Sequence, residues 1–366
     1  MSIQTEKTMW PGRRLLDLLG IDIPIVQAPM AGASGTEMAI AVSEAGGLGS
    51  LPCAGLDSGK IVAAIRTFRQ HSLKPLNVNF FCHTKENPDP VRDAAWKKRL
   101  AKYYEEKGID VPEFVATAGL SPFDETMCEV VEQHKPEIVS FHFGLPEKQL
   151  LNRVKACGSI VFSSATTVEE ARWLEANGCD VIIAQGIEAG GHRGMFLTDE
   201  ITTQVGTLAL TPQVVDAVNV PVIAAGGIAD GRGIVAAFAL GASGVQIGTA
   251  YLFAPESLVS DIHRSALHDS TDTALTNLFS GRPARSLVNR LMREEGFSSV
   301  EMPPFPTAGA ALAPLKARAE ASGSADFSSL WAGQSVGLGC AMGARDLTLQ
   351  LAANATQCLN SLGSTA

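Results

Sequence analysis

The stretch Gly186-Ile187-Glu188-Ala189-Gly190-Gly191-His192-Arg193-Gly194 places one histidine in a glycine-rich loop, directly after an apolar run over residues 181–184. Glycine lets a backbone approach a ligand closely, and histidine has the side chain whose usual pKa lies nearest neutrality. We therefore expect a strand followed by a catalytic loop here, with His192 as the catalytic residue. Taken alone, such a loop is also typical of a tight turn with an exposed histidine.

Two further apolar runs end in glycine in the same way. Residues 222–225 lead into Gly226-Gly227, and residues 244–247 lead into Gly248-Thr249. Three successive strand ends of this kind indicate one shared ligand.

The chain alternates short β-branched runs with helical patterns, which is typical of βα units around a parallel sheet. Eight strands are predicted, near residues 23–27, 48–51, 76–80, 138–141, 160–163, 181–185, 222–225 and 245–248. Helices are predicted between them, over residues 36–45, 58–70, 124–134, 147–157, 167–176, 211–218 and 230–240. The predicted fold class is α/β, a (β/α)8 TIM barrel.

Two segments depart from this alternation. Residues 82–123 form an insertion after the third strand, with a charged helix over residues 91–107 that either covers the barrel mouth or is a solvated decoration. Beyond residue 253 the pattern becomes helical, with helices expected over residues 272–278, 284–295, 309–322 and 344–362. We predict a barrel domain over residues 1–265 and a C-terminal helical extension, packed on the barrel, over residues 266–366.

The composition of the chain limits which kinds of molecule it is expected to bind. The chain of 366 residues is 46% hydrophobic and 18% charged, with a formal net charge of −9. The acidic balance and the lack of a long basic run argue against nucleic acid or an anionic membrane and favour a small molecule. We expect no membrane span, no secretory signal and a cytoplasmic location, as a monomer or homodimer. The seven scattered cysteines predict neither a metal site nor a disulfide framework.

The strand ends predict the kind of ligand. In barrels of this type phosphate commonly binds between the loops after strands seven and eight, where Gly226-Gly227 and Gly248-Thr249 stand. A proline-fixed backbone at Ala28-Pro29-Met30 can lie flat against a ring system, and the amides of Asn79 and Gln185 can pair with the edge of a flavin or purine. Strand-end capping is the alternative for either amide. Together these positions indicate a mononucleotide-type cofactor.

At this point the chain resembles the nitronate monooxygenase family, formerly called 2-nitropropane dioxygenase. The segments that carry the resemblance are Gln27-Ala28-Pro29-Met30, Asn79-Phe80, residues 184–194, 224–228, 246–249 and 280–285, and Leu330-Trp331-Ala332-Gly333-Gln334.

The resemblance implies an FMN-dependent flavoprotein, an oxidoreductase of nitronate detoxification. It would oxidise alkyl nitronates, with propionate 3-nitronate as the expected substrate, using O2 and releasing nitrite and a carbonyl product. The expected cofactor-binding residues are Ala28, Pro29, Met30, Asn79, Gln185, Gly190, Gly191, Gly226, Gly227, Gln246, Ile247, Gly248 and Thr249. The nitronate would give one electron to the flavin, and oxygen would take it up.

His192 would act as base toward a neutral nitroalkane, or as hydrogen-bonding or cationic partner of the nitronate anion. His142 and Tyr103 are candidate substrate contacts, and His83 and Tyr251 are weaker ones. Glu188 is expected to orient the loop through backbone N–H groups. Arg193 is expected to be a surface or structural ion-pair residue, whereas Arg282 and Arg285 fit either anion binding or packing.

Two other functions stay open from the sequence. An FMN-dependent NAD(P)H:quinone or enoyl-thioester reductase of the same barrel group would keep a similar loop but would need room for a nicotinamide. A flavin-binding protein without catalysis would keep the cofactor site alone.

Overall fold

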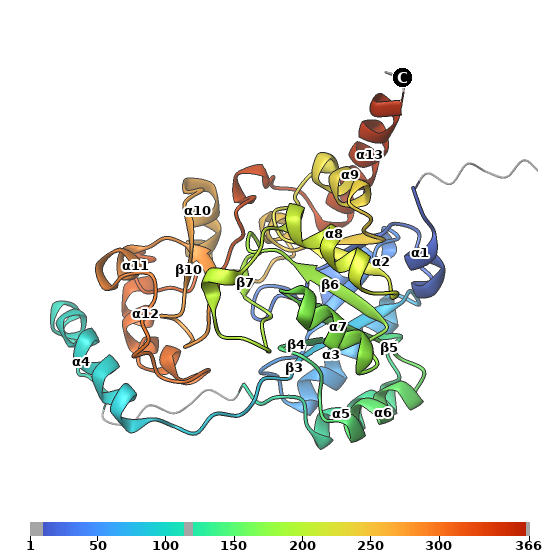
Figure 1. Ribbon diagram of the computed structural model, residues 1–366. Helices are drawn as coiled ribbons and strands as arrows, with labels where there is room; N and C mark the ends of the chain where they lie inside the picture. The colour runs from blue at the N-terminus through green and yellow to red at the C-terminus, as the bar shows by residue number, and fades with distance from the viewer. Residues whose placement is uncertain (1–9, 113–119, 364–366) are drawn as a thin grey trace, which may run out of the picture.

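The computed structural model describes residues 10–112 and 120–363, and it contains a barrel of eight parallel strands (Figure 1). The strands follow the order β1-β9-β8-β6-β5-β4-β3-β2, and a bridge between Val26 and Leu48 joins the first to the last. Their bounds are β1 (Ile25–Gln27), β2 (Gly49–Pro52), β3 (Leu76–Phe81), β4 (Ile138–His142), β5 (Ile160–Ala165), β6 (Val181–Gln185), β8 (Val222–Ala225) and β9 (Gly244–Ile247). The predicted barrel and all eight predicted strands are confirmed.

Helices cover the outside of the barrel because apolar side chains at helical spacing face the strands (Figure 1). Seven of them follow strands: α2 (Thr36–Glu44), α3 (Ser58–His71), α5 (Glu125–His134), α6 (Lys148–Ala156), α7 (Val168–Ala176), α8 (Thr207–Ala217) and α9 (Gly231–Ala239). The side chains of Thr167 and Asp230 cap the first turns of α7 and α9. A short helix, α1 (Arg14–Leu19), precedes β1 and was not predicted.

The last helix of the chain completes the ring around the barrel. Helix α13 (Ala344–Gly363) packs against α9 and α2, where the helix after the eighth strand belongs in this fold. Its apolar face joins the core that β1, β8 and β9 share, through Leu347, Leu351 and Ala355. Residues 254–343 are therefore an excursion between β9 and its helix. The domain boundary at residue 265 stays a prediction.

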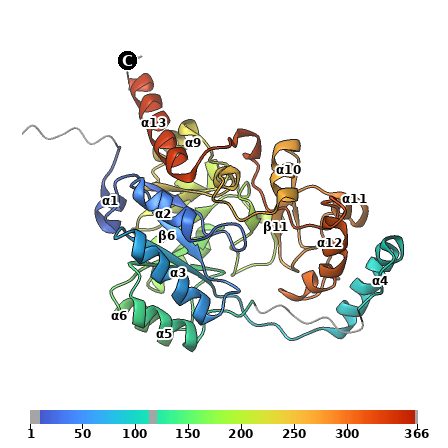
Figure 2. The ribbon, with the colours of Figure 1, turned by 180° about the vertical axis from the view of Figure 1, so that it is seen from behind.

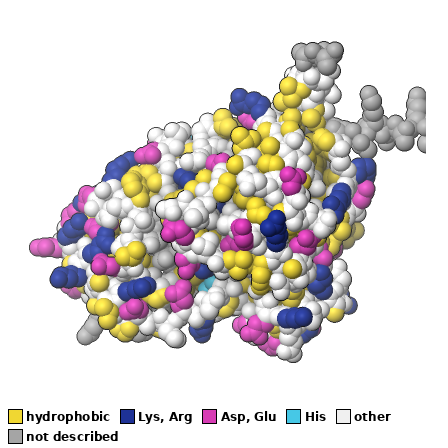
Figure 3. Space-filling view, in the orientation of Figure 1, with side chains coloured by type: hydrophobic (Ala, Val, Ile, Leu, Met, Phe, Trp, Pro, Cys, Tyr) yellow, Lys and Arg dark blue, Asp and Glu magenta, His cyan; other side chains and the backbone are white. Residues whose placement is uncertain are grey.

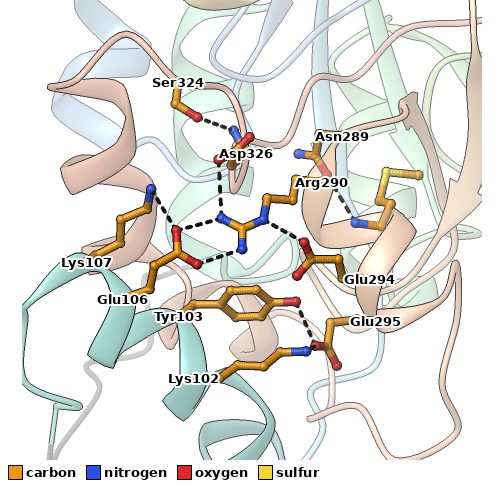
Figure 4. A network of polar contacts seen from close by, with 11 residues as sticks. Lys102, Tyr103, Glu106, Lys107, Asn289, Arg290, Glu294, Glu295, Ser324 and Asp326 are labelled. Carbon is orange, nitrogen blue, oxygen red and sulfur yellow. Dashed lines mark hydrogen bonds and ion pairs between the residues drawn. The ribbon is translucent and has the colours of Figure 1, made fainter.

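The excursion forms a second lobe together with the insertion after β3 (Figure 2). The inserted helix α4 (Pro90–Lys107) packs against α12 (Ala313–Glu320), and a separate apolar core joins α4, α11 (Arg290–Glu295) and α12 through Trp96, Leu100 and Leu315. Ion pairs join α4 to α11: Arg290 pairs with Glu106 at 2.6 Å, and Lys102 pairs with Glu295 at 2.7 Å (Figure 4). The insertion is a structural part of this lobe.

Of the helices predicted in the second lobe, the one over residues 272–278 is wrong, and the one over residues 284–295 is a helix only from Arg290. Residues 272–278 contain strand β10 (Thr273–Thr276), and residues 284–295 contain strand β11 (Ala284–Leu287) before α11. Both join an antiparallel sheet with β7 (Gly191–His192), in which His192 pairs with Ala284. β10 and β11 pair with each other, and β11 also pairs with β7 from much earlier in the sequence, so this sheet overrides the local helix propensity. Helix α10 (Asp261–Asp269) was missed.

The surface agrees with the acidic composition. On the face in Figure 3, Lys and Arg side chains are interspersed with Asp and Glu and form no large basic patch. None of the helices within residues 10–112 and 120–363 combines the length and apolar character needed to cross a bilayer.

Candidate active site

A cavity of about 590 Å³ lies at the carboxyl ends of the barrel strands, between the barrel and the second lobe. Its barrel side is built from the ends of β1, β3, β4, β6, β8 and β9, and its opposite side from residues 258–263 and 328–335 and from α12. Parallel strands converge their carboxyl ends on one edge, which explains why distant loops meet here.

The loop after β6 is held by an amide and a guanidinium. Gln185 donates from Nε2 to the main-chain oxygen of His192 (3.0 Å) and accepts at Oε1 from the N–H of Gly194 (2.7 Å). Arg193 is 1% exposed and donates to the carbonyls of Gly186 (2.6 Å) and Gln185 (2.7 Å). The expectation of a surface or ion-paired Arg193 is therefore corrected, because the guanidinium serves buried main-chain acceptors.

Glu188 supports the same loop from behind. Its carboxylate accepts from the main-chain N–H of Thr207 at 2.8 Å and from the Thr207 hydroxyl at 2.9 Å. The predicted orienting role of Glu188 is confirmed, although its partners lie at the start of α8. Across the loop, the backbones of Gly190 and Gly333 touch: a Cβ on Gly190 would lie 2.5 Å from the Gly333 nitrogen.

His192 stands in the cavity wall with its ring fixed by Ser280. The ring Nε2 lies 2.9 Å from Ser280 Oγ, and the Ser280 hydroxyl donates to the carbonyl of Arg282 at 3.2 Å. With the Ser280 hydroxyl donated to Arg282, His192 Nε2 is the N–H nitrogen and Nδ1 carries the lone pair. Burial lowers the pKa of His192 to about 3, and the charges of His142 and Arg282 act in the same direction. At neutral pH the ring is an uncharged hydrogen-bonding group or base.

His142 also borders the cavity, as predicted, but both its nitrogens are engaged. Its Nε2–H donates to the His192 carbonyl at 3.2 Å, and Ser164 Oγ donates to its Nδ1 at 2.6 Å. Burial lowers the pKa of His142 to about 4. His142 therefore positions the main chain of His192.

Aromatic rings enclose the His192 imidazole. The ring centroids of Trp331 and Phe305 lie 5.3 and 5.4 Å from that of His192, and the centroid of Phe81 lies 6.3 Å away. His83 is 4% exposed and packs edge-on against Phe305 at 4.9 Å. It does not line the cavity. These rings give the His192 imidazole largely apolar neighbours.

Arg282 adds a positive field behind this wall. Its guanidinium carbon lies 4.6 Å from the centroid of Phe143 and 5.9 Å from that of Phe305, which are cation–π distances. Its Nη1 is buried and has no hydrogen-bond partner within the described residues. Burial lowers the pKa of Arg282 from its usual value. The field favours an anion in the cavity.

The barrel side of the cavity fits a phosphorylated ring system. Gly226 and Gly227 have φ of +110° and +72°, which glycine adopts without strain, and the N–H groups of Gly227 and Ile228 donate to no acceptor in the described part of the chain. Gln246 borders the cavity, and its buried Oε1 lacks a partner there. Asn79 donates to Ser140 Oγ at 2.9 Å, so its amide oxygen is free to accept. Free donors at the rim suit a phosphate, and free acceptors suit hydroxyls and a ring N–H.

The structure brings nearly all predicted site residues together. The cavity is lined by Ala28, Pro29, Met30, Asn79, His142, Gln185, Gly190, Gly191, His192, Gly226, Gly227, Gln246, Gly248 and Thr249. Ile247 is not among them: it is fully buried in the barrel core, because successive strand side chains point to opposite sides. The weaker candidate Tyr251 is buried as well and bonds Thr348 at 2.7 Å.

Tyr103 also lies away from the cavity. It is 1% exposed in the second lobe and donates to Glu295 at 2.8 Å (Figure 4). Its prediction as a substrate contact assumed that the insertion covers the barrel mouth, whereas α4 docks on α11 and α12.

Sequence reasoning missed the contribution of the second lobe. Trp331 and Lys316 line the cavity, and Ser280 bonds His192. Ser280 and Trp331 stand in segments that carried the family resemblance, yet no local pattern gave them a role. Lys316 had no signal of its own.

The fold and the site define an enzyme of the (β/α)8-barrel class whose ligand cavity, walled by an uncharged imidazole, lies at the strand ends. The match to the nitronate monooxygenase family model spans residues 13–353. Nitronate monooxygenase of Pseudomonas aeruginosa is 43% identical over 91% of this chain and 96% of its own, and that of Paraburkholderia phytofirmans is 41% identical over 99% of each. A solved nitroalkane oxidase from Streptomyces ansochromogenes superposes with a TM-score of 0.87 at 36% identity, covering 95% of this chain and 99% of that one. The chain belongs to the nitronate monooxygenase family, and it is an oxidoreductase.

Proposed function

We propose that this enzyme is an FMN-dependent nitronate monooxygenase that oxidises alkyl nitronates with O2 and releases nitrite and a carbonyl product. The observation that carries the proposal is the pairing of two different walls in one cavity. One wall offers free backbone donors at Gly227 and Ile228, and the other offers the uncharged, enclosed imidazole of His192.

The cofactor wall would hold FMN without a charged residue. The rim at Gly226, Gly227 and Gly248 would receive the phosphate, Gln246 the ribityl hydroxyls, and Asn79 the polar edge of the ring. When bound, FMN supplies the one-electron chemistry that amino-acid side chains lack.

The residues of the opposite wall bind and orient the substrate. A nitronate is already an anion, and the nearby Arg282 guanidinium favours its entry into the cavity. With Nε2–H donated to Ser280, His192 Nδ1 carries the lone pair and would take the proton from the α-carbon of a neutral nitroalkane. The rings of Phe81, Phe305 and Trp331 give the reacting carbon apolar surroundings.

Anaerobic mixing of the purified, flavin-loaded protein with substrates tests this proposal. Bleaching of the flavin absorbance by ethyl nitronate, followed by nitrite release when O2 is admitted, is the expected result. Bleaching by NADH but not by nitronate would instead assign a reductase. A flavin that responds to neither would assign a non-catalytic binding protein, and a protein that binds no FMN would overturn the cofactor assignment.

A further inference from the structure

Glu170 is a buried carboxylate that the proposed chemistry does not use. It lies in the first turn of α7 and is 0% exposed. Its Oε1 accepts from the main-chain N–H groups of Phe196 (2.6 Å) and Leu197 (3.2 Å), just beyond the His192 loop. Its Oε2 accepts from the main-chain N–H (2.6 Å) and the hydroxyl (2.7 Å) of Thr166. Both oxygens of the carboxylate are therefore occupied by donors, as a buried charge requires.

A chain of hydrogen bonds leads from this carboxylate to Arg193. The Thr166 hydroxyl donates to Glu170 and accepts from Gln204 Nε2 at 3.0 Å. Gln204 Oε1 in turn accepts from Arg193 Nε at 3.1 Å and from Nη2 at 2.9 Å. Each link sets the direction of the next, because an acceptor at Thr166 turns the Gln204 NH2 group toward it and the amide oxygen toward Arg193. All four side chains are buried.

Arg193 carries this chain to the main chain around His192. It directly follows His192 in the sequence, and its guanidinium donates to the carbonyls of Gly186 and Gln185, where β6 passes into the loop. Burial lowers the pKa of Arg193 to about 10, and the negative charge of Glu170 acts in the opposite direction. Two buried charges of opposite sign thus stand at the ends of one chain. Loss of the carboxylate should loosen the guanidinium that holds the loop.

We propose that Glu170 is a positioning residue for His192, acting through Thr166, Gln204 and Arg193. This inference rests on the proposed function. The second lobe fixes the imidazole ring, and this chain fixes the main chain that carries the ring. Proton removal from the α-carbon of a nitroalkane depends closely on where the base stands, whereas a pre-formed nitronate needs no proton transfer. A loosened loop should therefore slow the neutral substrate more than the anion.

Glu170→Gln removes the charge and leaves a single accepting oxygen for two pairs of donors. In the flavin-loaded enzyme we expect kcat for nitroethane to fall about tenfold, with little change in KM and a smaller loss with pre-formed ethyl nitronate. The ratio of the two rates is the decisive quantity, because a merely less stable enzyme would lose both rates equally. An unchanged ratio in Glu170→Gln would overturn the inference.

Glu175→Gln is the matched control. Glu175 lies in the same helix and accepts from the main-chain N–H groups of Asn219 (2.6 Å) and Val220 (3.2 Å), which precede β8 at the other end of the barrel. This substitution should lower the melting temperature and leave the ratio of the two rates at the wild-type value. The same change of ratio in both variants would assign Glu170 a structural role only and overturn the inference.

Thr166 tests the route and covers the case in which Glu170→Gln does not fold. Thr166→Val removes the hydroxyl at similar volume and should slow nitroethane selectively, whereas Thr166→Ser keeps the hydroxyl and should keep the wild-type ratio. Glu170→Gln combined with Thr166→Val should be no slower than Glu170→Gln alone, because both substitutions break the same chain. Multiplied losses in the double variant, or equal ratios in the two Thr166 variants, would overturn the route.

A measurement without catalysis separates this inference from the proposed function. If the wild type turns over neither nitroethane nor its nitronate, the proposed function fails, and the placement of the loop is then measured by amide hydrogen exchange over residues 186–194. Exchange there should be faster in Thr166→Val than in Thr166→Ser. Equal exchange in these two variants would overturn the inference.

Discussion

The two walls of the cavity are built on opposite principles. The cofactor wall belongs to the barrel and offers main-chain groups and side-chain amides. It consists of Ala28, Pro29, Met30, Asn79, Gln185, Gly226, Gly227, Gln246, Gly248 and Thr249. The histidine wall (His192, His142, Phe81 and Trp331) offers imidazoles and aromatic side chains, and the second lobe supplies its Trp331 and fixes its His192.

The difference separates two tasks. Strand ends of a closed barrel are fixed by the sheet, so they can hold a constant ligand with backbone atoms. A wall that takes Trp331 and the support of His192 from a separate lobe can change its chemistry with less disturbance of the barrel. Damage to the first wall should therefore lower cofactor content, whereas damage to the second should spare it.

His192→Asn should give the largest effect and separate the two walls. Asparagine retains hydrogen-bonding capacity but offers no base, so turnover of neutral nitroalkanes should fall by about 100-fold or more. Pre-formed nitronates need no proton removal and should be affected less. FMN content, measured from the flavin-to-protein absorbance ratio, should stay at the wild-type level. Unchanged rates with both substrate forms would remove His192 from the mechanism.

Gly190→Ala tests the close backbone contact between the loop after β6 and residues 332–333 of the second lobe. The added Cβ would lie 2.5 Å from the Gly333 nitrogen and 2.6 Å from the Ala332 carbonyl carbon, so one backbone must shift. We expect a loss of about 1–3 kcal/mol in the free energy of unfolding, together with reduced FMN content. Urea unfolding and flavin content are the measurements.

Gly343→Ala is the control for that substitution, because its Cβ would meet only Glu256 Oε1 at 3.6 Å. If Gly190→Ala were as stable and as flavin-rich as this control, the close contact between the loop and the second lobe would be refuted.

The barrel could be predicted from the sequence because each of its strands and helices has a recognisable pattern within its own residues. Each strand is a short apolar run, and glycines such as Gly46, Gly178 and Gly241 end helices with φ near +90° to +98°. The same locality explains why Ala28, Gly226 and Gly248 were found: a residue just after a strand must reach the barrel mouth. The Ile247 side chain does not reach the cavity, because the alternation within β9 turns it into the core, and its role toward the cofactor stays a prediction.

The second lobe was less predictable because its elements depend on distant partners. β11 pairs with the nearby β10 and also with β7, which lies far earlier in the sequence, and the residues of Ala284–Leu287 carry no local sign of the β7 partner. Ser280, Lys316 and Trp331 reach the site through the same long-range packing. Within the second lobe, the helices α4 and α12, which have strong local patterns, were predicted near their observed bounds.

Acid should destabilise the folded protein through four histidines in and near the cavity. Burial lowers the pKa of His83, His142 and His263 to about 4 and that of His192 to about 3, from the usual 6.5. Between these values the unfolded chain binds more protons than the folded one, so stability is lost as pH falls from about 6.5 toward 4. The melting temperature should drop by several degrees between pH 7 and pH 5.

His263→Asn provides a comparison for the acid effect, because it removes one of the four groups and should make the fall in melting temperature shallower. In the same pH range kcat/KM for pre-formed nitronates should show no break from His192. A melting temperature that is constant from pH 7 to pH 5, or a kinetic break near pH 6.5, would contradict the uncharged imidazoles.

Tyr103→Phe should have the smallest effect, and it tests whether the insertion takes part in the site. The phenol donates to Glu295 at 2.8 Å within the second lobe, so its removal should cost about 1 kcal/mol of stability. Tyr104→Phe is a matched control, since Tyr104 donates to the Ala311 carbonyl at 2.7 Å in the same helix contact. Both variants should keep the wild-type KM for nitronates. A raised KM in Tyr103→Phe alone would return this residue to the substrate wall, and α4 would then have to close over the cavity during turnover.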